Sequence, residues 1–506
     1  MLTPYDILGP DGSIARRLER YELRQEQLDM AEAVHRAFIA KRHLAVEAGT
    51  GVGKSFAYLV PAILQTAGDQ NNAGTILEQP KPNDSEPDEE DPFYGEKPPR
   101  SRDSNRFEGN YSDLNHSDLN RLDPNRELQQ IAERGIPDES AFIPRVVIST
   151  HTISLQEQII EKDIPFLRSV LPFEFTAVLV KGRGNYLCLR RLHTVQQKQG
   201  LLFDDRKLQE LQRIVDWSKE TEEGSRSSLN PEPDWSIWGE ICCEAGNCLG
   251  KKCSYFASCF YAQARRRIAN AQILVVNHAL LFSDLSVRMQ GGSILPVYHF
   301  LVFDEAHTME QVAANHLGFS VTQGQIEYNL NRLYNPRTQR GLLTDQSLGE
   351  KIVKSLIVVL QQAVDECFYA SENFFQDLET WLQRHPGSNG RIRKSRIVNN
   401  SLSGSIRKLN EKLRELLEQL KNPNERQELR SARERMAALA GNIDVWVLQG
   451  LEEESVYWLE ATHSGRGKPR ISVNAVPIDI GPILREQLFA KIPSIVMTSA
   501  TLSTGK

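Results

Sequence analysis

The residues best suited to chemistry lie in one short stretch near the amino terminus. A glycine-rich run follows an apolar segment and precedes a stretch with helical spacing at residues 56–64. Glycines in such a turn let backbone amides surround phosphate oxygens, and the start of a helix adds positive potential. The pattern predicts that Lys54 neutralises the outer phosphates and that the Ser55 hydroxyl binds magnesium. The predicted nucleotide-binding residues are Ala48, Gly49, Thr50, Gly51, Val52, Gly53, Lys54 and Ser55, with Ala48 where the strict pattern has glycine.

A second stretch supplies the acidic groups that a phosphate loop requires. The apolar residues 300–303 run directly into Asp304 and Glu305. A carboxylate at the end of a buried strand can hold magnesium, and its neighbour can position an attacking water. We therefore predict Asp304 as a magnesium ligand, and Glu305, Lys54 and Asp304 as the catalytic groups of an ATP-hydrolysing site. A strand that merely ends in solvated carboxylates is the weaker alternative beside a phosphate loop.

The cysteines suggest a metal site rather than disulfides. Seven are present, an odd number, which fits a reducing compartment. Cys188 is followed at a distance by Cys248, Cys253 and Cys259. Four thiolates can hold a [4Fe–4S] cluster or a structural zinc ion. The spacing favours the cluster, since zinc usually takes closely paired cysteines, but spacing alone leaves both open, and Cys243 is an alternative ligand to Cys248.

A parallel sheet would bring these groups together. Apolar runs predict its strands, and ligands bind at the carboxyl ends of such strands. Helical spacing predominates from about 320 to 450, and two short segments predict a hairpin that returns the chain to the sheet. The strands are expected at 43–47, 145–149, 175–180, 273–276, 300–303 and 495–498, and the hairpin at 457–459 and 471–473. One helical face would hold Ile352, Leu356, Val359, Ala363 and Cys367, and another Ile406, Leu409, Leu413, Leu416 and Leu420.

The bulk composition predicts a globular protein of several domains. The chain has 506 residues, of which 40% are hydrophobic and 25% charged. It lacks an apolar run of about 18 residues and the features of a secretion signal, so we expect a cytoplasmic protein without a membrane partner. The net charge of −6 gives no overall attraction for nucleic acid. DNA binding would therefore require a local basic groove.

One segment stands apart from this α/β pattern. Residues 78–126 are rich in proline and charge and contain no Val, Ile, Ala or Met. Such a segment cannot bury enough apolar surface to offset the entropy of ordering. We predict a disordered insertion at 68–142, either inert or used to dock a partner.

The motifs, taken in order, resemble those of superfamily 2 helicases. The phosphate loop, the stretch from Asp304 to His307 and residues 498–502 are similar to motifs I, II and III. Residues 21–27 resemble the segment that reads adenine, which adds Gln27 to the predicted nucleotide-binding residues. Residues 149–156 resemble motif Ia.

Two further strings narrow the resemblance. Residues 181–188 and 275–281 are characteristic of the DinG/XPD-like iron–sulfur DEAH helicases, and the cysteine region resembles the bacterial DinG/YoaA type. The resemblance covers residues 5–66 and 143–506. It implies a 5′→3′ DNA helicase in DNA repair or replication restart, with ATP, Mg²⁺ and a [4Fe–4S] cluster on Cys188, Cys248, Cys253 and Cys259. The implied partner is single-stranded or forked DNA, bound by a monomer; the cysteine domain argues against RNA.

The implied fold class is α/β, a RecA-like P-loop sheet with two inserted domains. Basic and aromatic side chains around the cysteines would contact the backbone and stack on the bases of a single DNA strand. They are Lys251, Lys252, Arg265, Arg266, Arg267, Tyr255, Phe256, Phe260 and Tyr261. The predicted domains are 1–185 (RecA-like, first part), 186–262 (iron–sulfur), 263–318 (RecA-like, second part), 319–476 (helical arch) and 477–506 (last RecA-like strand).

Motifs IV–VI of a second RecA-like domain do not occur within the 506 residues. In relatives these motifs supply arginines that complete the ATP site, so we expect little activity from this chain alone. The alternative function is that of a catalytically silent fragment. It would bind nucleotide and single-stranded DNA and need a separately encoded second motor domain.

Overall fold

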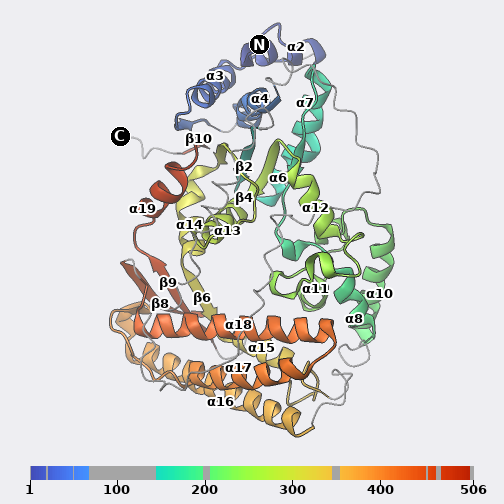
Figure 1. Ribbon diagram of the computed structural model, residues 1–506. Coiled ribbons are helices and arrows are strands. Elements are labelled where there is room, and N and C mark those ends of the chain that lie inside the picture. Colours follow the sequence, from blue (N-terminus) through green and yellow to red (C-terminus); the bar gives the residue numbers. More distant parts are fainter. Residues whose placement is uncertain are drawn as a thin grey trace, which may run out of the picture.

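The computed structural model describes residues 2–18, 21–49, 51–67, 144–197, 205–344, 354–451, 454–462 and 469–501. The insertion predicted at 68–142 lies outside the described residues. Three parts can be followed in Figure 1: a sheet flanked by helices, a cysteine-bearing unit that includes α8 and α11, and a helical unit that includes α16, α17 and α18. In this view the sheet lies at the top, the cysteine-bearing unit at the right and the helical unit at the bottom.

Six parallel strands form the central sheet, in the order β1-β10-β5-β2-β4-β3. The inner strands are buried on both faces, which explains why they are almost continuously apolar in sequence. The predicted α/β fold with a parallel RecA-like sheet is confirmed. The strands are β1 (Leu44–Glu47), β2 (Val146–Thr150), β3 (Ala177–Leu179), β4 (Ile273–Asn277), β5 (Phe300–Asp304) and β10 (Ser494–Ser499).

The register of the sheet places the motifs at one edge. β10 comes from the far end of the chain and lies between β1 and β5. Glu47 pairs with Ser499, and Thr498 pairs with Asp304. The phosphate loop, the residues after β5 and the end of β10 therefore meet at the carboxyl edge.

Helices cover both faces of the sheet. One apolar core lies under α1 (Pro4–Leu8), α2 (Ser13–Arg17), α3 (Gln25–Ile39), α4 (Lys54–Ala67) and α7 (Ile164–Val170). The opposite core lies under α13 (His278–Met289), α14 (Met309–Leu317), α19 (Gly481–Leu484) and the π-helical turn η11 (Arg485–Phe489). A short helix α6 (Ile153–Gln158) continues through the π-helical turn η4 (Ile159–Asp163) into α7.

The cysteine-bearing unit has a small core of its own. Trp238, Ile237 and Ile214 are fully buried in it, and Leu192 is nearly so. Its helices are α8 (Leu189–Gln197), α10 (Asp205–Glu220), α11 (Trp235–Ile241) and α12 (Phe260–Ala269), joined by the short 3₁₀ turns η6 (Arg226–Ser228), η7 (Ala245–Asn247) and η8 (Gly250–Lys252). A further 3₁₀ turn, η5 (Arg183–Asn185), leads into this unit.

The helical unit contains four longer helices and a second sheet. Its helices are α15 (Gln323–Leu333), α16 (Lys354–Arg384), α17 (Ser401–Gln419) and α18 (Pro423–Leu448). The stripe predicted on α17 is confirmed, since Ile406, Leu409, Leu413 and Leu416 are fully buried and the adjoining Leu420 nearly so.

The stripe predicted on α16 is partly wrong. Val359 is exposed, and Ile357, Leu360 and Val364 are buried instead. Ala363 and Cys367 are buried as expected, while Ile352 lies outside the described residues. Valine, isoleucine and leucine occupy several faces of this helix, so composition alone does not define the side that meets α17.

The predicted hairpin forms, but it belongs to the second sheet. β8 (Ser455–Thr462) pairs with β9 (Arg470–Pro477), and these strands join β6 (Phe319–Thr322) and β7 (Arg391–Ile392) in the order β6-β9-β8-β7. Its pairings are antiparallel. The chain thus enters the helical unit through β6 and leaves it through β9, side by side.

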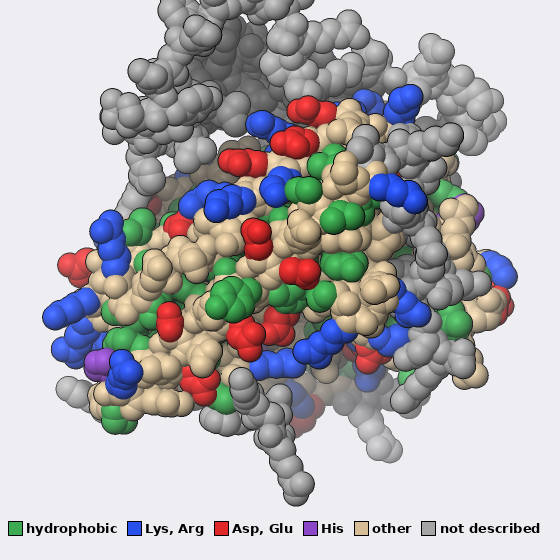
Figure 2. All heavy atoms as spheres, turned by 90° about the horizontal axis from the view of Figure 1, so that it is seen from below, with side chains coloured by type: hydrophobic (Ala, Val, Ile, Leu, Met, Phe, Trp, Pro, Cys, Tyr) green, Lys and Arg blue, Asp and Glu red, His purple; other side chains and the backbone are tan. Residues whose placement is uncertain are grey.

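Figure 2 shows the molecule from below, toward the helical unit. Lysines and arginines are interspersed there with Asp and Glu and with apolar side chains. Among the described residues, none of the helices is long and apolar enough to span a membrane.

Candidate nucleotide site and cysteine cluster

The phosphate loop leaves β1 and enters α4 through a backbone that favours glycine. Gly51 and Gly53 have φ values of +92° and +84°, which side chains with a Cβ rarely adopt. A Cβ on Gly53 would also collide with the Gln27 side chain. The Ala48 amide donates to the Ser499 carbonyl, so the loop is tied to the neighbouring strand. Thr50, a predicted nucleotide-binding residue, lies outside the described residues.

Gln27 and Arg24 hold this loop from α3. The Gln27 side-chain amide donates to the Gly53 carbonyl at 2.9 Å, and Arg24 donates to the Gly51 carbonyl. The predicted adenine-reading segment therefore lies directly against the phosphate loop. Gly49 and Val52 belong to the same turn, between β1 and α4.

Lys54 and Glu305, 251 residues apart, form an ion pair. Lys54 Nζ donates to Glu305 Oε1 at 2.9 Å, and both side chains are largely shielded from water. Glu305 has a left-handed backbone, with φ +57° and ψ +48°, an uncommon conformation for a residue other than glycine. The turn directs its carboxylate toward the loop rather than along β5.

Asp304 is fixed from both sides of its carboxylate. Tyr58 donates its hydroxyl to Oδ2 at 2.9 Å, and the Glu305 amide donates to Oδ1 at 3.0 Å. Burial raises the pKa of Asp304, and the hydrogen bond from Tyr58 opposes that rise. Burial raises the pKa of Tyr58, and hydrogen bonding by the nearby hydroxyl of Ser55, the other predicted magnesium ligand, opposes that rise. Loop, acidic strand end and both predicted magnesium ligands are thus brought together.

The end of β10 joins the same network. His307 Nδ1 and Ser499 Oγ lie 2.8 Å apart, and Ser499 Oγ donates to Glu305 Oε2 at 3.4 Å. The end of β10 is therefore linked by hydrogen bonds to the predicted catalytic glutamate.

Two functional contacts went unpredicted. One is that of Tyr58 with Asp304. The other joins Ser149 Oγ and His278 Nδ1 at 2.7 Å, at the ends of β2 and β4. Burial lowers the pKa of His278 to about 4, so this imidazole is neutral at physiological pH. Ser149 and His278 both lie in motif strings, at 149–156 and 275–281. Their place in these motifs is the sequence feature that could have indicated a functional role.

The predicted cluster ligands are held in one unit by backbone pairing. The Cys188 amide donates to the Ile241 carbonyl, and the Cys243 amide donates to the Tyr186 carbonyl. These bonds bring the remote Cys188 beside the segment that leads to Cys248. Cys253 follows η8, and Cys259 caps the start of α12.

The thiols influence one another electrostatically. A hydrogen bond between the Cys243 and Cys248 thiols raises the pKa of Cys243 and lowers that of Cys248 to about 5. Burial raises the pKa values of Cys188 and Cys259, and a Cys259 thiolate would raise that of Cys188 further. All seven cysteines are free thiols.

The donor set fits a [4Fe–4S] cluster by its chemistry. Four or five thiols from one small unit are within electrostatic reach of each other, and the positive charge of Arg183 lowers the pKa of Cys248. Within the described ranges, no three His, Cys, Asp or Glu side chains are grouped as a site for a single metal ion.

The basic and aromatic residues around the cysteines divide into two groups. Lys251, Lys252, Arg266 and Arg267 are exposed, as a DNA-binding surface requires. Phe260, in contrast, is buried in the unit's core, so the prediction that it faces a DNA strand is wrong. Its ring packs against Gly224, where an added Cβ would collide with it.

Tyr261 also packs within the protein. Its ring lies 4.3 Å beneath the Arg183 guanidinium, and its hydroxyl accepts from Arg183 at 3.2 Å. Arg265 donates to the Ile294 carbonyl. Tyr255 and Phe256 are half-buried.

Glu244 connects the cysteine-bearing unit to the helical unit. Its carboxylate forms ion pairs with Arg191 at 3.3 Å, Arg332 at 3.4 Å and Arg435 at 3.0 Å. Burial raises the pKa of Glu244, but the three arginine charges outweigh it and the pKa lies below the ordinary value. Gln427, on α18, adds a hydrogen bond to the Gly246 carbonyl at 2.6 Å.

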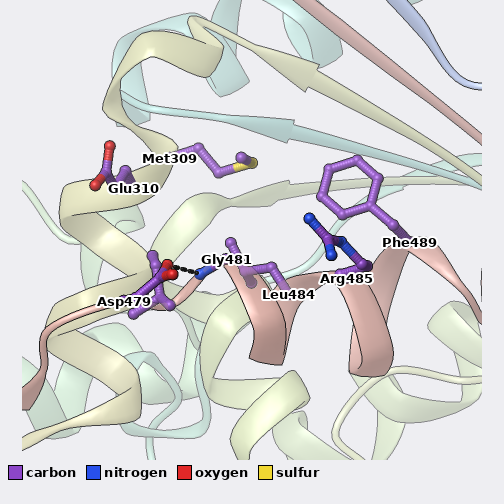
Figure 3. Close-up of a pocket in the computed structure, with 8 residues that line it drawn as sticks. Met309, Glu310, Asp479, Gly481, Leu484, Arg485 and Phe489 are labelled. Carbon is purple, nitrogen blue, oxygen red and sulfur yellow. Dashed lines mark hydrogen bonds between the residues drawn. The ribbon is translucent and has the colours of Figure 1, made fainter. Parts of the chain in front are cut away.

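A separate pocket of about 460 Å³ lies between α14 and the α19–η11 segment. Figure 3 shows Met309 and Glu310 on one side and Leu484, Arg485 and Phe489 on the other. None of the predicted site residues lines this pocket.

The fold and the site together define a class: a P-loop nucleotide-binding α/β domain with two units inserted into it. Comparison with known proteins narrows that class. The family model described as DEAD_2 matches residues 246–326. The chain is 27% identical over 507 aligned residues to the ATP-dependent DNA helicase YoaA of Haemophilus influenzae, covering 99% of this chain and 63% of that protein.

The chain is also similar to two further relatives. The chain is 30% identical to the ATP-dependent helicase DinG of Mycobacterium tuberculosis, over 63% of this chain and 40% of that protein. It is 23% identical to the 3′-5′ exonuclease DinG of Bacillus subtilis, over 98% of this chain and 47% of that protein. A solved structure described as an XPD helicase aligns with 96% of this chain and 59% of its own, at 11% identity and a TM-score of 0.40.

These matches confirm the resemblance that the motifs predict: the chain is similar to the YoaA and DinG proteins over nearly its whole length. It spans 63% of the length of the YoaA proteins that it matches.

Proposed function

We propose that the complete protein is an ATP-dependent 5′→3′ DNA helicase acting in DNA repair or replication restart. The observation that carries this proposal is the convergence of Lys54, Asp304 and Glu305 at one edge of the sheet. The helicase names of the relatives support it. ATP, Mg²⁺ and single-stranded or forked DNA are the proposed substrate, cofactor and partner, and the protein is proposed to act as a monomer.

In the proposed mechanism, Lys54 changes partner. The incoming phosphates would replace the Glu305 carboxylate as the counter-charge of Lys54, because the lysine of a phosphate loop pairs with the outer phosphates. Glu305 would then be released to orient the attacking water, while Asp304 and Ser55 hold Mg²⁺. Ser499 and His307 contact Glu305, so this exchange would alter the contacts at the end of β10.

We propose Cys188, Cys248, Cys253 and Cys259 as the ligands of a [4Fe–4S] cluster. When bound, such a cluster cross-links the small cysteine-bearing unit. We assign this unit to residues 186–262 and an arch domain to 319–476. The remaining segments, 1–185, 263–318 and 477–506, make up the RecA-like domain. The exposed basic residues beside the cysteines would contact DNA phosphates.

Full activity is proposed only with a second RecA-like domain, carried by the same protein or by a separate one. Translocation requires two grips on the strand whose spacing changes with the nucleotide state. An arginine acting on the γ-phosphate is worth about 10³–10⁵ in rate in related P-loop enzymes. Residues 1–506 alone are therefore proposed to bind nucleotide and single-stranded DNA weakly and to separate no duplex.

The test compares strand separation by the complete protein on duplexes with a 5′ or a 3′ single-stranded tail. We expect ATP-dependent separation of the 5′-tailed duplex, and none with Lys54→Ala. Lys408→Ala, at an exposed site on α17, is the matched control and should unwind normally. Separation that persists in Lys54→Ala would contradict the proposed site, and a preference for the 3′-tailed duplex would contradict the polarity.

A further inference from the structure

Tyr58 is placed by helical periodicity on the face of α4 that meets the acidic strand end. It follows Ser55 by three residues and Lys54 by four, so all three side chains lie on one side of the helix. Its ring is fully buried. The phosphate-loop pattern ends at Ser55 and assigns no role to this tyrosine.

The Tyr58 hydroxyl lies beside both of the residues proposed to bind magnesium. It donates to Asp304 Oδ2 at 2.9 Å, and the Ser55 hydroxyl is close enough to lower the pKa of Tyr58. Asp304 is 98% buried, so water cannot readily replace this donor. With Oδ1 taking the Glu305 amide, the plane of the carboxylate is fixed.

These bonds leave the carboxylate able to bind a cation. Each oxygen of an ionised carboxylate accepts two hydrogen bonds or ligands, and one position on each oxygen is used by protein donors. Partners that orient a ligating group strengthen metal binding, because the ligand no longer has to be ordered when the metal arrives.

We propose that Tyr58 is a positioning residue for magnesium, holding Asp304 and Ser55 in the arrangement that binds the ion with ATP. The proposal rests on the proposed ATP-binding function and deepens it. Tyr58 itself contacts neither nucleotide nor metal. Loss of the Tyr58 hydroxyl should therefore reduce the gain in ATP affinity that Mg²⁺ provides. The affinity for ATP in the absence of Mg²⁺ should not change.

The experiment measures binding of a fluorescent ATP analogue to residues 1–506, with Mg²⁺ and with EDTA. Tyr58→Phe removes the hydroxyl and keeps the ring. We expect its affinity in EDTA to match the wild type and the gain from Mg²⁺ to fall about tenfold, since hydrogen bonds to charged groups are the strong ones. Tyr457→Phe is the matched control, because Tyr457 is a buried, hydrogen-bonded tyrosine of the helical unit.

A wild-type gain from Mg²⁺ in Tyr58→Phe would overturn the proposal. So would a Tyr58→Phe chain without a cooperative melting transition, because the hydroxyl would then serve stability. In an Asp304→Asn background, Tyr58→Phe should cause no further loss of the Mg²⁺ gain, and an additive loss would also count against the proposal. Wild-type protein that binds the analogue in neither condition would instead refute the proposed ATP site.

Discussion

At the phosphate loop, the groups proposed to act on ATP are already paired with one another. Lys54 bonds to Glu305, and Tyr58 bonds to Asp304, across more than 240 residues of sequence. In the cysteine-bearing unit, a hydrogen bond links the Cys243 and Cys248 thiols, and backbone bonds hold Cys188 and Cys243 in place. The nucleotide site is therefore held by contacts between its own side chains, whereas the thiol site would depend on the proposed cluster to become rigid.

The two regions also differ in how they are supported. The phosphate loop lies on a sheet with an apolar core on each face. The cysteine-bearing unit has a smaller core and is joined to α15 and α18 by polar contacts, in which Glu244 pairs with Arg332 and Arg435. Loss of a ligand should thus affect function at the first site and local folding at the second.

The largest expected effect is on metal content. Anaerobically purified protein should contain about four irons per chain and negligible zinc, because thiolates in this number suit a [4Fe–4S] cluster. Cys253→Ala should lose the iron and open its unit, measured by iron analysis and limited proteolysis. Cys242→Ala is the control and should keep its iron.

The paired thiols allow a sharper version of this test. Cys248→Ala should lose the cluster while Cys243→Ala retains it. The reverse pattern would replace Cys248 by Cys243 in the ligand set. One zinc and no iron in the wild-type protein would contradict the cluster itself.

The next effect concerns Glu305 in the complete protein. Glu305→Gln keeps the size of the side chain but removes the charge that would orient water. We expect ATP binding to persist and hydrolysis to fall by about 10²–10³, as for loss of a preorganised polar group. Measuring ATP binding and single-turnover hydrolysis on the same variant distinguishes a loss of hydrolysis from a loss of binding. Loss of binding would mean that Glu305 maintains the loop structure instead.

A smaller effect is expected at Glu244. Glu244→Gln removes the carboxylate that three arginines share, although Arg332 keeps Glu240 as a partner, and should lower the free energy of unfolding by about 1.5–3 kcal/mol. That is below the value for a fully buried pair, since a quarter of the side chain is exposed. Hydrogen exchange should increase in α11 and α18. Glu418→Gln, at an exposed site on α17, is the control, and equal effects of both variants would remove the special role of Glu244.

The smallest effect is a pH dependence of that same contribution. The folded-state pKa of Glu244 lies below its ordinary value of 4.5. The stabilisation is therefore fully present above pH 4.5 and is lost as the pH falls through the folded-state pKa. The difference in unfolding free energy between wild type and Glu244→Gln should shrink in that range. A difference that grows on acidification would contradict the ion-pair explanation.

The sequence predicted the parallel sheet and the residues of the phosphate loop because both depend on local patterns. It did not predict the Tyr58–Asp304 bond, because nothing near Tyr58 indicates a partner 246 residues away. The same limit applies to β6, whose partner β9 is about 150 residues distant. Val359 was misplaced because α16 is apolar on more than one side, and only packing against α17 selects the buried one.

The preorganised phosphate site is tested most directly by titrating residues 1–506 with ATP and Mg²⁺ in a calorimeter, beside Lys54→Ala and the Lys408→Ala control. We predict saturable binding at one site in the wild type and in Lys408→Ala. In Lys54→Ala the affinity should fall by about a hundredfold or more, as expected for removal of a preorganised charge. Equal affinity in wild type and Lys54→Ala, or no binding to the wild type, would contradict the account.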